Sequence, residues 1–83
     1  MTKKGIDKEL ELLKISNRFK VGRAEFSVYP DYFRDGSGNI GGVCVFVEDT
    51  LIQHTIEIFR TDHLINLRVF LNLLLDGNIK VVS

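Results

Sequence analysis

The sequence predicts a small α+β domain: a helix, a three-stranded antiparallel meander, a second helix and an optional short C-terminal strand. Both helices are expected on one face of the sheet. Three observations predict this class. Apolar residues recur at helical spacing near both ends of the chain, apolar and polar residues alternate through its middle, and 83 residues are enough for one domain only. Residues 1–83 are therefore treated as a single domain.

Residues 6–18 are expected to form the first helix. Ile6, Leu10 and Leu13 repeat at intervals of four and three, which places them on one side of a helix. Acidic residues come early in this segment and basic residues late, an order that complements the helix dipole. Residues 1–5 precede the periodic pattern and are expected to be frayed.

The first strand is expected between Phe19 and Pro30, where apolar and polar residues alternate. Gly22 stands where the parity of this alternation changes, so a bulge or bend is expected there. Pro30 cannot donate a ladder hydrogen bond and should end the strand. Residues 30–42 hold four of the seven glycines and are interpreted as a long Gly-rich loop.

Two further strands are expected at residues 43–48 and 51–60. The first is apolar on both faces, which is typical of a central strand. In the second, strict alternation places His54, Ile56 and Ile58 on one face and Phe59 on the other. Residues 79–82 allow a short terminal strand, and the sequence leaves open whether it pairs within one chain or between two.

The second helix carries apolar residues on two sides. Thr61 or Asp62 is the expected N-cap, and Gly77 the residue that follows the C-cap. One side holds Leu64, Leu67, Phe70, Leu71, Leu74 and Leu75; the other holds Ile65, Val69 and Leu73. Since one sheet can cover only one side, the second stripe must face either the first helix or another molecule, and the sequence does not decide between them.

Composition argues against several function classes. The net charge is zero, no stretch is apolar enough to span a membrane, and the spacing of His, Cys, Asp and Glu matches no metal site. Cys44 is the single cysteine and lies in an apolar run, which fits a buried thiol and a reducing, cytoplasmic location. His54, His63 and Asp62 lack a nucleophile to complete a catalytic arrangement. We therefore expect no enzyme, no cofactor and no metal.

A protein-binding role is the leading hypothesis. Tyr32, Phe33 and Arg34 are residue types that dominate protein interfaces, and they fall in the expected loop. Ile65, Val69 and Leu73 form the second partner-binding set, which suggests a homodimer. The size and neutrality of the chain suit an inhibitor, an immunity factor or a regulatory protein, for example one encoded by a phage or a mobile element. The identity of the partner is not readable from the sequence.

Nucleic-acid binding is the alternative. Residues 1–23 hold seven basic and three acidic side chains, which gives the molecule a positive end. Lys14, Arg18, Lys20 and Arg23 would contact phosphates, and Tyr29, Tyr32 or Phe33 would stack on an unpaired base.

Overall fold

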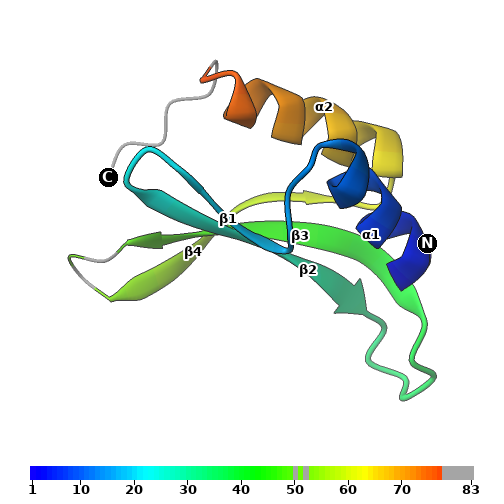
Figure 1. Ribbon diagram of the computed structural model, residues 1–83. Helices are drawn as coiled ribbons and strands as arrows, with labels where there is room; N and C mark the ends of the chain where they lie inside the picture. The colour runs from blue at the N-terminus through cyan, green and yellow to red at the C-terminus, as the bar shows by residue number, and fades with distance from the viewer. Residues whose placement is uncertain (50, 52, 78–83) are drawn as a thin grey trace.

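The computed structural model describes residues 1–49, 51 and 53–77. It contains α1 (Lys3–Leu12), β1 (Arg18–Val21), β2 (Ala24–Tyr32), β3 (Ile40–Asp49), β4 (His54–Thr61) and α2 (Leu64–Leu75). The strands form one antiparallel sheet in the order β1-β2-β3-β4. Both helices lie on the same face of this sheet (Figure 1). The α+β class is confirmed, but the described sheet has four strands where three were expected.

The extra strand arises because the segment expected to be one strand is a hairpin. Gly22 and Arg23 form a two-residue turn closed by the pair Val21 and Ala24. Gly22 has a φ of 61° and Arg23 is not in the positive-φ region, the combination found in a type II′ turn. The change of parity at Gly22 therefore marks a chain reversal. It brings Phe19 onto Phe26 on the helix side, with ring centroids 5.5 Å apart.

The predicted loop at residues 30–42 is too long, because both of its predicted boundaries are wrong. β2 continues through Pro30 to Tyr32 and β3 begins at Ile40, so only residues 33–39 connect them. β1 pairs with β2 no further than Ser27, so the described residues place no strand beside Pro30 on the side to which its nitrogen turns. Pro30 is tolerated in β2 because no ladder hydrogen bond is required from its nitrogen on that side. Gly42 belongs to β3, where a Cβ would lie 2.7 Å from the carbonyl oxygen of Thr61.

The first helix lies earlier in the chain than expected. It begins at Lys3, so residues 3–5 are helical, because the hydroxyl of Thr2 accepts a hydrogen bond from the Gly5 amide as an N-cap. It ends at Leu12, followed by a Schellman motif: the amides of Lys14 and Ile15 donate to the carbonyls of Glu11 and Leu10. Lys14 occupies the left-handed position, with a φ of 58°.

The second helix has its N-cap one or two residues later than expected. His63 occupies the N-cap position without a side-chain hydrogen bond. The Thr61 hydroxyl instead accepts from the His63 amide and from the Asn66 side chain. Asp76 is the C-cap and Gly77 follows with a φ of 76°, which confirms the expected helix end. The strand proposed at residues 79–82 lies outside the described residues.

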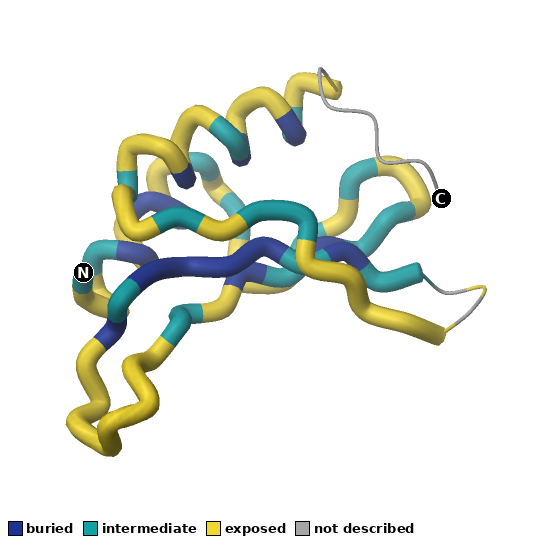
Figure 2. The backbone as a smooth tube through the Cα atoms, turned by 180° about the vertical axis from the view of Figure 1, so that it is seen from behind, coloured by how far each residue is buried: buried dark blue, intermediate teal, exposed yellow. Residues whose placement is uncertain are grey.

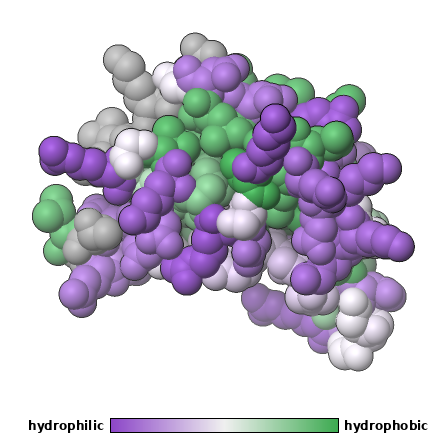
Figure 3. All heavy atoms as spheres, in the orientation of Figure 1, coloured by the Kyte–Doolittle hydropathy of each residue, from purple (hydrophilic) through white to green (hydrophobic). Residues whose placement is uncertain are grey.

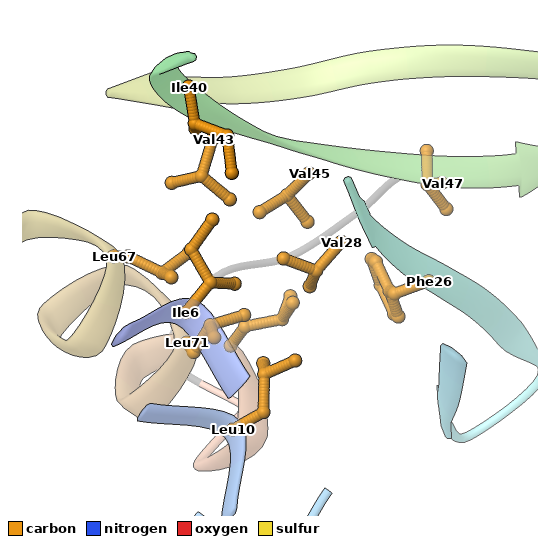
Figure 4. Packing of buried hydrophobic residues seen from close by; sticks show 11 residues of the cluster. Ile6, Leu10, Phe26, Val28, Ile40, Val43, Val45, Val47, Leu67 and Leu71 are labelled. Atoms are coloured by element: carbon orange, nitrogen blue, oxygen red, sulfur yellow. The ribbon is translucent and has the colours of Figure 1, made fainter. Parts of the chain in front are cut away.

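The core lies between the helices and one face of the sheet. Figure 2 shows the most deeply buried backbone along β3 and on the inner turns of the helices. Figure 4 shows side chains of α1 and α2 pointing toward those of β2 and β3. The cluster contains Ile6, Leu10, Phe26, Val28, Ile40, Val43, Val45, Val47, Leu67, Leu71 and Leu74. Alternation along β2 and β3 therefore places one set of residues in the core and leaves the other on the face opposite the two described helices.

A bulge in β4 changes which of its residues face the core. Val45 pairs with Phe59 and Phe46 with Glu57, so Ile58 is the additional residue. Phe59 consequently lies on the helix side, where its ring stacks on Phe70 of α2 with centroids 4.1 Å apart. The expectation that Phe59 faces away from Ile56 and Ile58 is wrong, because strict alternation cannot anticipate an inserted residue.

Candidate interaction surfaces

The first candidate surface is the outer stripe of α2, defined by Ile65, Val69 and Leu73. These side chains are 66%, 53% and 41% exposed, whereas Leu67 and Leu71 on the opposite side of the helix are 0% exposed. The stripe is four-residue spaced and points away from the sheet. α1 does not cover it in the protomer. Apolar surface lies around α2 in Figure 3, bordered by polar side chains.

An ion pair explains why α1 leaves the stripe uncovered. Glu9 of α1 accepts hydrogen bonds of 2.7 Å from both Nε and Nη2 of Arg68 on the flank of α2. Glu9 is buried, and these hydrogen bonds hold the pKa of its carboxyl below the usual value. The two-point contact fixes α1 along one flank of α2, about a quarter turn from the stripe.

The second candidate surface is the loop between β2 and β3, which projects beyond the end of the sheet (Figure 1). Tyr32 and Phe33 are 49% and 56% exposed, and Arg34 is also exposed. Phe33 nevertheless lies against Gly41, where its ring would stand 2.8 Å from an added Cβ. The far end of the ring thus packs against the hairpin, and about half of the residue's surface remains exposed.

The loop is ordered by its own hydrogen bonds. The amide of Phe33 donates to the carbonyl of Asn39 at 2.9 Å, and the amide of Ser37 donates to Oδ1 of Asp35 at 2.9 Å. Hydrogen bonds from Ser37 hold the pKa of the Asp35 carboxyl below its usual value. Such contacts reduce the entropy lost when the aromatic residues bind a partner.

The third surface is the sheet face opposite the helices, which sequence reasoning described incompletely. Tyr29 and Phe46 meet edge to face at its centre, with centroids 5.9 Å apart. Cys44 lies beside them and is only 4% exposed, and burial raises the pKa of its thiol to about 11. A shallow hollow of about 310 Å³ opens over these residues. Leu51, between β3 and β4, is exposed.

Ion pairs flank this aromatic centre on both sides. Arg60 binds Asp31 and donates to Glu57 at 2.7 Å, while Arg18 lies 3.3 Å from Glu25 and 3.8 Å from Glu48. Each cluster contains one cation and two carboxylates. The face around Tyr29 is therefore acidic rather than basic.

The residues of the nucleic-acid alternative are exposed but dispersed. Lys14 follows α1, Arg18 and Lys20 lie on β1, and Arg23 is in the β1–β2 turn. Arg18 already pairs with two carboxylates, and so does Arg60 on the other side of Tyr29. Nothing in this arrangement favours phosphate binding over protein binding, and a salt titration remains its test.

The histidines are not brought together. His54 begins β4 and His63 follows its end, so the length of the strand separates them. His54 is exposed. His63 lies 3.4 Å from Asp62, and both side chains are about 70% exposed. Across residues 1–49, 51 and 53–77, no cluster of three His, Cys, Asp or Glu side chains could bind a metal ion.

Neither described helix has the length and apolar character needed to cross a bilayer. A scan against protein-family models, a search of curated proteins and a search of solved structures each return no match to this chain.

Proposed function

We propose that the protein is a small interaction module that acts by binding other proteins, and that it self-associates through the outer stripe of α2. The observation that carries this proposal is the contrast within one helix: Leu67 and Leu71 are fully buried, while Val69, between them in sequence, is 53% exposed. A monomer gains nothing from three large apolar side chains in line on the outside of a helix.

The energy available from the stripe sets the strength of the association. Full burial of a Val, Leu or Ile side chain contributes about 1.5–3 kcal/mol, so burying the exposed part of these residues contributes about 1 kcal/mol each. Two copies packed stripe to stripe gain about 6–7 kcal/mol. Association costs about 4–15 kcal/mol in lost freedom. The stripe alone therefore supports a weak, reversible dimer, and a tighter one needs polar contacts at its rim.

The projecting loop supplies a separate contact set for a different protein. Tyr32 and Arg34 are residue types enriched at energetic hot spots, Phe33 lies between them, and the loop that follows β2 is internally hydrogen-bonded. This division suits an inhibitor, immunity factor or regulatory protein that dimerises through a helix and engages its target through a loop. The single buried thiol suits a reducing compartment such as the cytoplasm.

Sedimentation equilibrium of the full chain tests self-association. We expect the weight-average mass to rise with concentration toward twice the chain mass, and Val69→Lys to remain a folded monomer by circular dichroism. Thr55→Lys adds the same charge on the opposite sheet face and should still dimerise. A monomer at every concentration up to the millimolar range would refute the dimer. Unfolding of Val69→Lys, together with a monomeric parent, would show that the stripe belongs to the core.

A further inference from the structure

The edge strand β1 is much shorter than its neighbour. β1 spans Arg18–Val21 and pairs with β2 only as far as Ser27, whereas β2 continues to Tyr32. The stretch of β2 from Val28 to Tyr32 therefore has β3 on one side. On its other side, no strand within the described residues pairs with it beyond Val28.

The direction of each backbone group on this stretch follows from two hydrogen bonds. The amide of Val28 donates to the carbonyl of Asn17 at 2.8 Å, so Val28 turns its backbone away from β3. Groups two residues apart in a strand point the same way. The pairing with β3 shifts register between Asp31 and Tyr32, but the additional residue is Gly41 on β3, so β2 itself continues to alternate. Pro30 and Tyr32 therefore turn outward as well, while the amide of Phe33 donates back to Asn39 of the hairpin. The carbonyls of Pro30 and Tyr32 and the amide of Tyr32 are consequently presented along this edge.

A groove runs between this edge and α1. Its volume is about 660 Å³, and the linker after α1, through Ile15 and Asn17, closes one end. Ile6 and Leu10 contribute apolar atoms from the helix. Two basic and two acidic side chains form the rim (Lys3, Asp7, Glu11 and Lys14), and Lys3 lies 3.9 Å from Asp7. The rim is thus electrically balanced.

We propose that this edge and groove bind an extended, uncharged peptide segment of a partner protein as an added strand antiparallel to β2. The peptide would occupy the line along which β1 would extend if it were longer. Its amides would donate to the carbonyls of Pro30 and Tyr32, and one of its carbonyls would accept from the Tyr32 amide. A side chain on the helix side would contact Ile15, which is half-buried at the end of the groove. The balanced rim gives no advantage to a charged segment.

A second copy of β2 is a poor occupant of the same edge. Pro30 has no amide hydrogen, so an antiparallel pair of two such edges would place a carbonyl opposite a position that cannot donate. A peptide without proline at that position supplies the donor. This surface is distinct from the α2 stripe, so the inference does not depend on self-association through the stripe; it shares only Tyr32 with the second candidate surface.

The test uses a phage-displayed library of linear eight-residue peptides, followed by the synthetic peptide of the selected sequence. We expect enrichment of uncharged, β-favouring sequences. Methylation of the two peptide amides that face Pro30 and Tyr32 should weaken binding about tenfold each, since each removes one hydrogen bond, while the intervening amides should tolerate methylation. Equal tolerance at every position would overturn the added-strand geometry.

A matched pair of protein variants locates the site. Tyr32→Pro removes the one outward amide and should weaken binding at least tenfold, whereas Tyr32→Phe keeps the amide and should bind like the parent. If Tyr32→Pro does not fold, the methylation series on the parent chain decides. Binding lost in Val69→Lys but kept in Tyr32→Pro would overturn the proposal and assign the peptide to the α2 stripe. Failure to enrich any peptide would also overturn it, without bearing on dimerisation.

Discussion

Leu71 and Leu73 of α2 allow a test of which side of the helix is buried, because the same substitution can be made on each side. Leu71 is 0% exposed and Leu73 is 41% exposed, although they stand two residues apart. Replacing each by alanine removes the same atoms and leaves helix propensity almost unchanged. Leu71→Ala opens a cavity among the residues of both helices and the sheet (Figure 4), and should cost about 3 kcal/mol of unfolding free energy. For a domain of this size, that lowers Tm by about 12–24 °C.

Leu73→Ala should behave differently because it removes atoms that are largely in water. In a dilute monomer it should change the free energy of unfolding by less than about 1 kcal/mol. Chemical denaturation at two protein concentrations, tenfold apart or more, provides the assay. If the stripe mediates a dimer, the midpoint of the parent rises with concentration and that of Leu73→Ala rises less. A concentration-independent loss for Leu73→Ala as large as that for Leu71→Ala would refute the assignment of Leu73 to the surface.

Three further predictions concern single residues. Lys14→Gly should raise the free energy of unfolding by about 0.5–1 kcal/mol in urea denaturation, because glycine adopts the positive φ at this helix end without strain; a loss of stability would contradict the Schellman assignment. Glu9→Gln should reduce the loss of unfolding free energy that the parent shows as the pH falls. Because the pKa of Glu9 is lowered in the fold, its carboxylate stabilises the fold above the ordinary pKa of 4.5, and this contribution is lost as the pH falls below that value. An unchanged acid profile by urea titration at pH 3–6 would contradict a stabilising Glu9–Arg68 pair. Cys44, with a pKa raised to about 11, should resist a disulfide reagent at pH 8 until the chain is unfolded, and a fast native reaction would show that the thiol is not buried.

The elements themselves were largely predictable from sequence, because periodicity reports which side of a segment is buried. Residues of both expected helices and of all three expected strands adopt the expected type of structure. The errors lie at boundaries set by particular side chains. Thr2 starts α1 by capping it, and Gly22 reverses the chain where a local bend was expected. Both residue types serve several local roles, so sequence alone does not select one.

The candidate site residues were predictable as residue types but not as surfaces. The sequence named Ile65, Val69 and Leu73 as a second stripe, and left open whether the first helix covers it. Only the position of α1 answers this, and that position depends on the contact of Glu9 with Arg68 across 59 residues of chain. The peptide groove was missed because it exists only where β1 stops short of the end of β2.

By itself, then, the sequence determined the alternation of helix and strand segments and the two-sided apolar character of α2, since both depend on residues a few positions apart. The tertiary structure decided which apolar side remains exposed, which edge of the sheet has no described strand beside it and which face carries the ion-pair clusters around Tyr29. These properties depend on contacts between residues distant in the chain. No local pattern encodes the distance or angle at which such residues meet.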